Sequence, residues 1–327
     1  MPSIAVVGSI NMDLVVRAPR FPCAGETVLG SAFATIPGGK GANQAVAARR
    51  LGGDVSIVGC VGDDAFGTTM RRGLAAEGVD VRGLAMRAGM ASGIALITVD
   101  AAGENTIVVV PGANGTLGPD DVEAWRATIG ASRVLLLQLE VPIDAVGAAA
   151  RVAHEAGACV VLNAAPATSL PDALLGVVDY LVVNESEILA VAGGASDHTA
   201  AVEALRARGA RHIVLTLGAS GALLFAADGG TEAEAGFPVD VVDTTAAGDA
   251  FVGAFAVALA EGLTTGDAMR RGNAAGALTV MREGAQPSLP RREDVDAWLA
   301  APRRHPQASM VRSTLPLDLE IDGHEGP

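Results

Sequence analysis

The sequence lacks the features that mark nucleic-acid-binding and membrane proteins. Its 327 residues contain 23 Lys and Arg against 37 Asp and Glu, which gives a formal charge of −14, and its paired arginines are scattered along the chain. A nucleic-acid binder would show a basic face or run. No apolar run reaches the roughly 18 residues of a membrane helix, and the first residues show no signal peptide. We therefore expect no nucleic-acid partner, no membrane segment and a cytoplasmic protein.

Cysteine and nucleotide fingerprints are equally scarce. Cys23, Cys60 and Cys159 are far apart and have no zinc or CxxC spacing, so we expect reduced, mostly buried thiols. The five histidines form no motif. The patterns GxxxxGK[ST] and GxGxxG are absent, which disfavours a Walker A loop and a nicotinamide dehydrogenase.

Alternating strands and helices are what the sequence does contain. Continuous apolar strands between Ala-rich helices indicate a mostly parallel sheet that is covered on both faces. The expected strands are Ile4–Gly8, Val55–Gly59, Val134–Leu139, Cys159–Asn163, Tyr180–Val183, Ile213–Leu217 and Ala222–Ala226. The expected helices span residues 41–51, 64–77, 119–128, 142–156, 185–192, 199–208, 247–261, 266–281 and 292–300.

Two segments interrupt this rhythm, and the C-terminal segment departs from it. Residues 13–36 and 93–110 alternate polar and apolar residues, and the second predicts a hairpin around Ala101–Gly103. We expect antiparallel strands outside the main sheet, forming a flap that covers a site or pairs with another subunit. Residues 1–300 are then one domain. The Pro-rich segment 301–327 is expected to be flexible or loosely docked, with an edge strand in LPLDLEID as the alternative.

The stretch VVDTTAAGDAFVGAFAVALA, residues 241–260, places polar chemistry at the start of an apolar helix. The first turn of a helix has free N–H groups and the positive end of the dipole, so it suits an anion. The small residues Ala246, Ala247 and Gly248 leave that backbone open to an oxyanion. Asp249 has two interpretations: it caps the helix, or it accepts a proton from a hydroxyl that attacks phosphorus.

The residues just before this turn also have two interpretations. Asp243, Thr244 and Thr245 are either ordinary loop-capping residues or donors of oxygens, together with backbone carbonyls, to a cation beside the anion site. Glu140 follows a strongly apolar strand, and a charge at that end of a strand often marks a site in α/β sheets. Its alternative is a solvated loop acid.

A second glycine-rich turn, PGGKGANQAVAARRLGG at residues 37–53, again leads into a helix. Gly38 and Gly39 allow a ligand to approach the backbone closely, and Lys40 and Asn43 add donors. The combination of donors and acceptors suits a polyhydroxylated ligand.

Two polar residues after the first strand belong to the same argument. Asn11 and Asp13 are two residues apart, so they face the same side if the chain is extended. They supply acceptors for such a ligand, or they are simply turn formers at a strand end.

These motifs together resemble the PfkB carbohydrate kinases. The resemblance is carried by GSINMDLVV near the start, GGKGANQAVAA at 38–48 and DTTAAGDAFVGAF at 243–255, and it covers about residues 3–300. Further matching segments are LLLQLEVP, LNAAPA, VNESE, LTLGASG and REGAQPSLP. Many members carry Gly-Ala-Gly-Asp where this chain has Ala-Ala-Gly-Asp, the form common among members that phosphorylate D-ribose.

The resemblance implies a fold, a reaction and cofactors. The fold is α/β, with a mostly parallel central sheet, helices on both faces and a small antiparallel β lid. The reaction is ATP-dependent phosphorylation of D-ribose at its 5-hydroxyl, with Asp249 as general base and Ala246, Ala247 and Gly248 as the anion hole. Mg²⁺ accompanies ATP, K⁺ is an activating monovalent cation, and a homodimer forms through the lid.

The resemblance also assigns three sets of binding residues. The sugar-binding set is Asn11, Asp13, Gly39, Lys40, Asn43, Glu140 and Asp249. The ATP-binding set is Asn184, Glu187, Thr216, Gly218, Ala219, Ser220, Gly221, Gly248 and Asn273. The set around the monovalent cation is Asp243, Thr245, Thr279, Arg282, Gly284 and Ser288. Within the ATP set, Asn184 and Glu187 are implied near the phosphates and Mg²⁺, and Asn273 near the adenine.

Two further alternatives stay open at the level of sequence. A sibling kinase would act on deoxyribose, fructose or a nucleoside, because siblings share sugar-contact residues. A non-catalytic sugar- or nucleotide-binding protein would be free to lose Asp249 and the anion-hole turn, and both are present.

Overall fold

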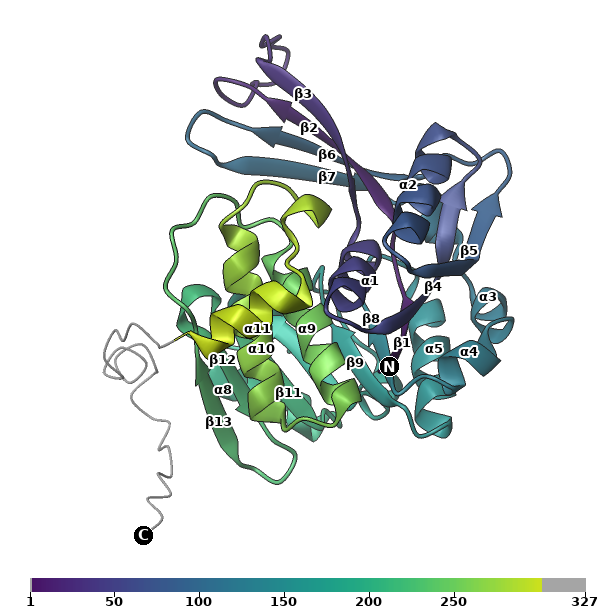
Figure 1. The fold of residues 1–327 in the computed structure, drawn as a ribbon, viewed down its shortest axis with the longest axis vertical. Helices are drawn as coiled ribbons and strands as arrows, with labels where there is room; N and C mark the ends of the chain where they lie inside the picture. The colour runs from purple at the N-terminus through teal and green to yellow at the C-terminus, as the bar shows by residue number, and fades with distance from the viewer. Residues whose placement is uncertain (1, 302–327) are drawn as a thin grey trace.

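A nine-stranded sheet forms the middle of the fold in the computed structural model, which describes residues 2–301 (Figure 1). Its strand order is β13-β12-β11-β10-β9-β8-β1-β4-β5. Every neighbouring pair from β11 to β5 is parallel, and β12 and β13 join antiparallel at one edge. The strands are β1 Ser3–Val7, β4 Asp54–Gly62, β5 Asp80–Arg87, β8 Val134–Leu137, β9 Cys159–Asn163, β10 Tyr180–Asn184, β11 His212–Thr216, β12 Gly221–Phe225 and β13 Thr231–Ala235. The predicted mostly parallel sheet is confirmed.

Helices cover both faces of this sheet because its strands are apolar on both sides. In β1, Ile4 and Val6 pack into one core and Ala5 and Val7 into the other. The first core contains side chains from α1 Lys40–Arg50, α2 Ala65–Ala76, α9 Ala247–Glu261, α10 Thr265–Val280 and α11 Arg292–Ala300. The second contains side chains from α3 Pro119–Glu123, α4 Arg126–Gly130, α5 Ile143–Glu155, α6 Asp172–Leu175, α7 Glu185–Val191 and α8 His198–Ala207.

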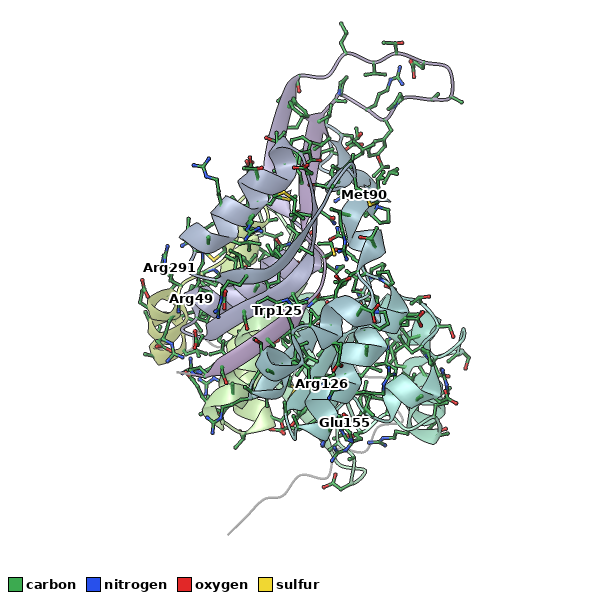
Figure 2. All side chains as sticks on the ribbon, turned by 90° about the vertical axis from the view of Figure 1, so that its right-hand side faces the viewer. Arg49, Met90, Trp125, Arg126, Glu155 and Arg291 are labelled. Atoms are coloured by element: carbon green, nitrogen blue, oxygen red, sulfur yellow. The ribbon has the colours of Figure 1, made fainter. Side chains whose placement is uncertain are left out.

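Three elements differ from the sequence expectation for local reasons. The expected helix 119–128 is two short helices, because Trp125 leaves the helical region with φ −113° and ψ 14° between α3 and α4. Arg126 then lies between Glu123 and Glu155, at 2.8 and 3.4 Å, and ties α4 to α5 (Figure 2). The strands β5 and β13 were not expected, since DVRGLAMR and TEAEA contain no continuous apolar run.

A separate four-stranded sheet, which we call the lid, projects from the main body (Figure 1). Its strands are β2 Asn11–Arg17, β3 Ala32–Gly38, β6 Gly93–Val99 and β7 Asn105–Val110, in the order β3-β2-β6-β7. The hairpin expected around 101–103 joins β6 to β7, where the Asp100 carboxylate accepts from the N–H groups of Ala102 and Glu104. The outer pairs are antiparallel as expected, whereas the central β2–β6 pair is parallel.

The remaining short elements are 3₁₀ turns near the strand ends: η1 Gly112–Thr116, η2 Gly218–Ser220 and η3 Gln286–Ser288. Among residues 2–301, no helix is both long enough and apolar enough to cross a membrane. Residues 302–327 lie outside the described residues, so the expectation for the C-terminal segment stays a prediction.

Candidate active site

The start of α9 presents bare backbone donors to open space. Ala246 precedes the helix in the left-handed region, with φ 61° and ψ 8°, and the first helical bond runs from Ala250 N–H to Ala246 C=O at 2.8 Å. The N–H groups of Gly248 and Asp249 come before that bond, so they have no intrahelical acceptor. A Cβ at Gly248 would meet nothing within 4 Å. The turn is therefore shaped to receive an anion.

The Asp249 carboxylate does not cap its own helix. It is buried, at 6% exposure, and it accepts from Nδ2 of Asn43 at 2.9 Å and from Nε2 of Gln44 at 3.0 Å. These bonds join α9 to the helix that follows the second glycine-rich turn. Burial raises the pKa of Asp249, and Lys40 and the two amides only partly offset that effect. The interpretation of Asp249 as a simple capping residue therefore does not fit its contacts.

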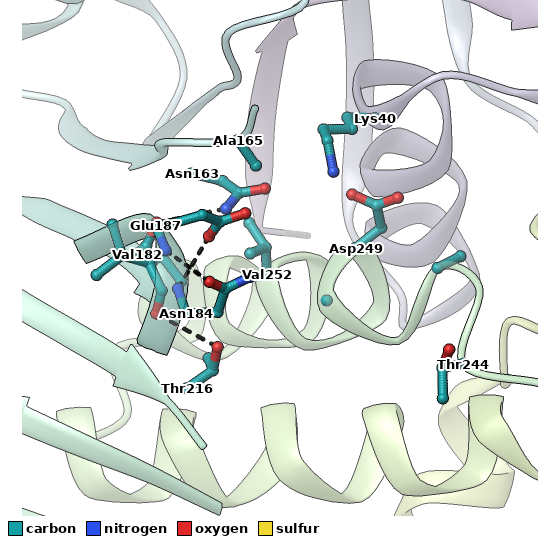
Figure 3. A pocket seen from close by; sticks show the side chains of 13 residues that line it. Lys40, Asn163, Ala165, Val182, Asn184, Glu187, Thr216, Thr244, Asp249 and Val252 are labelled. Carbon is teal, nitrogen blue, oxygen red and sulfur yellow. Dashed lines mark hydrogen bonds between the residues drawn. The ribbon is translucent and has the colours of Figure 1, made fainter. Parts of the chain in front are cut away.

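Lys40 stands at the first position of α1, and its ammonium points toward Asp249 (Figure 3). Burial lowers the pKa of Lys40, but Asp249, Glu140 and Glu187 together outweigh burial and hold it above its usual value. The ammonium is therefore charged, and it faces the same space as the helix start.

A pocket of about 230 Å³ lies between the start of α9 and the carboxyl ends of β9, β10 and β11 (Figure 3). Ligands of open α/β sheets bind at this end of the strands. The pocket is lined by Lys40, Asn163, Ala165, Val182, Val183, Asn184, Glu187, Thr216, Thr244, Ala246, Gly248, Asp249 and Val252. It brings together four of the residues expected to bind ATP, namely Asn184, Glu187, Thr216 and Gly248, with the expected base.

Asn184 and Glu187 form a reciprocal cap at the start of α7. Asn184 Oδ1 accepts from Glu187 N–H at 2.8 Å, and Glu187 Oε2 accepts from Asn184 N–H at 2.9 Å. Burial raises the pKa of Glu187, and the Asn184 N–H and Lys40 only partly counter it. The cap fixes both oxygen-bearing side chains at the rim of the pocket.

The expected sugar residues on β2 are buried and face the root of the lid. Asn11 is 2% and Asp13 8% exposed. A Cβ at Gly38 would lie 2.3 Å from Asp13 Oδ2, so glycine there makes room for this carboxylate. Burial, with Glu140 and Asp249 adding to it, raises the pKa of Asp13 to about 7. No hydrogen bond is among the causes that set this pKa, so no donor within residues 2–301 offsets burial and the two like charges.

Glu140 clamps the two sugar-site loops together. Its Oε2 accepts from the hydroxyl of Ser9 and from the N–H of Lys40, the latter at 3.0 Å. Gly39 adopts φ 87°, and a Cβ there would lie 2.6 Å from Asn11 N. The interpretation of Glu140 as a solvated loop acid does not fit these contacts.

The rest of the expected ATP set lies beyond this pocket. Gly218, Ala219 and Ser220 form η2. Gly221 packs against β13, where a Cβ would lie 2.1 Å from Glu234 O. Asn273 donates to the carbonyls of Glu234 and Ala235 at 3.0 and 3.3 Å, so the amide holds β13 in place. Contact of these residues with a nucleotide stays a prediction.

The expected cation residues converge on the loop before α9. Asp243 accepts from the N–H and hydroxyl of Thr245 through Oδ1 and from Gly284 N–H through Oδ2, at 2.9, 2.6 and 2.8 Å. Burial acts to raise the pKa of Asp243, but these hydrogen bonds outweigh it and hold the pKa below its usual value. Thr279 and Ser288 are fully buried nearby, and their hydroxyls donate to the carbonyls of Ala275 and Ala285. The site is rich in oxygen atoms, the ligands that hard cations prefer.

Among residues 2–301, no group of three or more His, Cys, Asp or Glu side chains is placed to hold a metal ion. A divalent ion that arrives with ATP needs few protein ligands, since phosphates and water supply most of its coordination. Glu187 and Asn184 carry suitable oxygens at the pocket and fit such an ion.

A model of the pfkB family carbohydrate kinases matches residues 1–292. The chain belongs to this family. A pfkB family kinase uses ATP together with a divalent metal ion such as Mg²⁺. The match spans both glycine-rich turns and the pocket between them.

Individual relatives match at similar length. A ribokinase of Haemophilus influenzae is 41% identical over 301 residues, which covers 91% of this chain and 98% of the relative. A deoxyribokinase of Salmonella typhi is 35% identical over 302 residues, with 91% and 98% covered. The structure of Arabidopsis thaliana ribokinase complexed with ribose and ATP matches with a TM-score of 0.84 at 32% identity, covering 92% of this chain and 99% of that one.

Several polar residues of this pfkB family kinase were not singled out from the sequence. They are Ser9, Gln44, Asn114, Gln138 and Asn163, all buried. Each sits in an otherwise apolar or small-residue stretch, as Gln138 does in LLLQLE. A buried polar side chain in such a stretch needs a partner, and that need was the available signal.

Proposed function

We propose that this chain is a ribokinase, which transfers the γ-phosphoryl group of ATP to the 5-hydroxyl of D-ribose. The observation that carries the proposal is the position of Asp249. Its carboxylate is buried at a bare helix start, and Asn43 ties it to α1, whose glycine-rich turn lies against Asn11, Asp13 and Glu140. Sugar acceptors and an anion site thus meet at one base.

The proposed reaction uses this geometry directly. Asp249 takes the proton of the 5-hydroxyl as its oxygen attacks the γ-phosphorus. The bond from that phosphorus to the bridging oxygen breaks, and its electron pair leaves with ADP. The N–H groups of Gly248 and Asp249, unpaired within residues 2–301 and in the turn that Ala246 and Ala247 begin, stabilise charge on the transferring group. Lys40 adds a positive charge on the same side.

Sugar recognition is assigned to acceptors that no donor within residues 2–301 fully satisfies. Asn43 donates to Asp249 while its own Oδ1 is buried without a hydrogen-bond partner among residues 2–301. At Asp13, no hydrogen bond from residues 2–301 offsets the burial that raises its pKa. Buried acceptors cost free energy when unpaired, so ligand hydroxyls are their natural donors. Asn11, Gly39, Lys40 and Glu140 complete the proposed sugar set.

The nucleotide is assigned to the pocket and the adjoining strand ends. Asn184, Glu187, Thr216 and Gly248 line it. The remaining proposed contacts are Gly218, Ala219, Ser220, Gly221 and Asn273. When bound with ATP, Mg²⁺ would neutralise phosphate charge in the transition state, and Asn184 and Glu187 are the residues that fit it.

K⁺ is proposed as an activating ion in the loop next to the anion site. The residues are Asp243, Thr245, Thr279, Arg282, Gly284 and Ser288, largely through carbonyls. Because Asp243 braces this loop to Gly284, an ion there would fix the turn that begins α9. We expect K⁺ to raise turnover more than Na⁺ does.

A homodimer through the lid and a cytoplasmic location complete the proposal. The lid exposes Phe33, Leu96, Ile107 and Val108 at 65, 46, 54 and 60%. Apolar surface of this kind on a projecting sheet favours pairing with another chain. A second copy of the lid is the proposed partner.

One experiment tests the reaction and the base together. ADP release is measured with ATP·Mg²⁺ and D-ribose, 2-deoxyribose, fructose or adenosine, with K⁺ or Na⁺, for the wild type and Asp249→Asn. Ribose-selective turnover that K⁺ stimulates and the mutant loses supports the proposal. Preference for 2-deoxyribose would make the chain a deoxyribokinase, as a relative at 35% identity is named. Ribose binding without turnover on any acceptor would point to a non-catalytic binding protein.

A further inference from the structure

A chain of buried amides lies behind Asp249. Gln138 Nε2 donates to Gln44 Oε1, and Gln44 Nε2 donates to Asp249 Oδ1 at 3.0 Å and to Asn163 Oδ1 at 3.1 Å. Gln44 and Gln138 are both fully buried. Both N–H bonds and the carbonyl of the Gln44 amide are therefore in use.

The neighbours of Gln44 fix which way its amide points. Asn163 Nδ2 donates to Val182 O at 3.3 Å, so its Oδ1 is the atom turned to Gln44. Gln138 presents an NH₂ group to the other side. If the Gln44 amide were flipped by 180°, its oxygen would face Asp249 Oδ1 and Asn163 Oδ1, and its NH₂ group would face the NH₂ group of Gln138. Asp249 Oδ1 consequently always receives an N–H.

The buried side chain of Gln138 leaves one of its own polar atoms without a hydrogen bond in the described part of the chain. Its Oε1 is buried and has no hydrogen-bond partner within residues 2–301. A Cβ at Gly8 would lie 2.0 Å from that oxygen, so glycine there leaves the side chain its room. An unpaired buried acceptor destabilises a fold. It is retained here with the NH₂ group of Gln138 aimed at Gln44.

We propose that Gln44 is a positioning residue for phosphoryl transfer: it holds Oδ1 of the Asp249 carboxylate in its ionised form and leaves Oδ2, on the Asn43 side, to take the hydroxyl proton. Gln138 acts through Gln44 by fixing the orientation of its amide. The inference rests on the proposed function in one respect, that Asp249 is the base. Of the proposed sugar and nucleotide residues, only Asp249 is hydrogen-bonded to the side chains of the two glutamines within residues 2–301.

Charged groups on several elements surround Asp249, and the neutral Gln44 donor adds to those that favour its ionised form. Lys40 on α1 favours the carboxylate, whereas Glu140 after β8, Asp13 on β2 and Glu187 on α7 oppose its ionisation. Burial opposes it as well. Removing the Gln44 N–H leaves only Lys40 and the Asn43 amide to offset burial and the acidic neighbours, so the pKa of Asp249 rises.

Kinetics against pH tests the proposal. The variants are Gln44→Met, Gln44→Glu and Gln138→Met, with Ser132→Ala as the matched control. Ser132 is a buried polar residue just before the start of β8, whereas Gln138 follows the end of that strand. The Ser132 hydroxyl donates to Ile129 O at 2.7 Å. For Gln44→Met we expect kcat to fall about tenfold or more and its acid limb to move up by about one pH unit. The KM values for sugar and ATP should stay within about threefold, because uniform binding is not affected.

The other variants have graded expectations. Gln44→Glu sets a second carboxyl against Asp249, so the pair shares a proton and the acid limb moves further. Gln138→Met is expected to move the acid limb in the same direction, but by less than the Gln44 variants do. Ser132→Ala lowers thermal stability and leaves the acid limb in place. A purely structural role for Gln44 would give the pattern of the control, and that result overturns the proposal.

A second readout needs no substrate. In protein labelled with ¹³C at the aspartate carboxyl carbon, the resonance that Asp249→Asn removes is assigned to Asp249, and its titration is followed. A higher midpoint in Gln44→Met than in the wild type supports the proposal, and equal midpoints overturn it. If wild-type protein phosphorylates no sugar but the midpoint still moves, the proposed function fails while the effect of Gln44 on Asp249 stands. Gln138→Met gives the same test if Gln44→Met does not fold.

Discussion

Asn114 donates a hydrogen bond to Asn11 Oδ1 at 2.7 Å across 103 residues of sequence. The same side chain accepts from Ile10 N–H and donates to Ile10 C=O, both at 3.0 Å. Three bonds from one amide, 1% exposed, therefore fix the first residues of β2. Asn114 lies on η1, so this short element positions Asn11 at the proposed sugar site. The sequence pattern did not predict this contact.

Asn114→Ala is expected to weaken sugar binding more than turnover. It frees Asn11 and leaves two buried backbone groups of Ile10 unpaired, at about 1–3 kcal/mol of unfolding free energy each. We expect the KM for ribose to rise about tenfold, with smaller changes in kcat and in the KM for ATP. Steady-state kinetics with either substrate varied measures this. Asn105→Ala, at an exposed asparagine of the lid, is the control. Equal losses for both substrates would argue against a local role at the sugar site.

Asp13→Asn is expected to stabilise the free protein, and more so at high pH. The folded protein holds the pKa of Asp13 at about 7, against 3.8 for the free side chain. Between these pH values the native state binds more protons than the unfolded state, so stability falls as pH rises through the window, by on the order of 1–4 kcal/mol. Asp13→Asn removes the ionisable group, and with it this fall in stability as the pH rises.

Urea unfolding of the wild type and Asp13→Asn at pH 5 and pH 8 measures the difference. Asp54→Asn, at the exposed start of β4, is the control. The gain should be larger at pH 8, and ribose binding should be lost at both. A gain independent of pH would contradict the burial of an ionisable group there.

Ala246→Gly is expected to raise stability. Ala246 is the only non-glycine residue with positive φ among residues 2–301. An alanine in the left-handed region destabilises the folded state by about 1–2 kcal/mol. Glycine removes this strain, but its greater freedom in the unfolded state offsets part of the benefit, so we expect the free energy of unfolding to rise by about 0.5–1 kcal/mol. Urea unfolding measures it. Ala204→Gly, at an equally half-buried position inside α8, should lose about 0.5–1 kcal/mol. A loss at both positions would mean that the turn carries no strain.

The exposed lid strands are expected to hold two copies together. Leu96 and Val108 lie opposite each other in the β6–β7 pair, so they share one face of the lid. Replacing both with Asp should shift the mass in solution from dimer to monomer, because buried unpaired charge opposes association. Light scattering during size-exclusion chromatography measures this. Val241→Asp, at an equally exposed valine outside the lid, should leave the mass unchanged. A wild type that is already monomeric would overturn the homodimer.

Local sequence patterns predicted the regular elements and missed those that depend on tertiary context. The apolar strand VLLL and the helix at 247–261 are visible because burial on both faces and small apolar residues leave a clear pattern. The edge strand TEAEA has no such pattern, since only one neighbour pairs with it. The parallel pairing of β2 with β6 joins segments about 80 residues apart and leaves no local trace.

The site divides in the same way. Asp249, Lys40 and Asn43 were predicted because glycine-rich turns and a resemblance mark them. The side chains of Gln44 and Asn114 each make three hydrogen bonds to residues distant in sequence, and their partners are set by how α1, α9 and η1 pack. The sequence shows that these side chains are polar, but it does not identify their hydrogen-bond partners.

The strands of the lid are all fixed at one end. Asn11 pairs with Gly38 and Gly93, and Ile94 pairs with Val110, so the four strands enter and leave the body side by side. The far ends are joined by residues 18–31 and 100–104, and Arg17 Nη2 at the end of β2 lies 3.5 Å from Glu283 Oε1 of the body. The end of the lid that joins the body therefore carries the proposed sugar contacts Asn11 and Asp13. A second lid bound to the projecting part would therefore act on the same strand that carries Asn11 and Asp13 into the proposed sugar site.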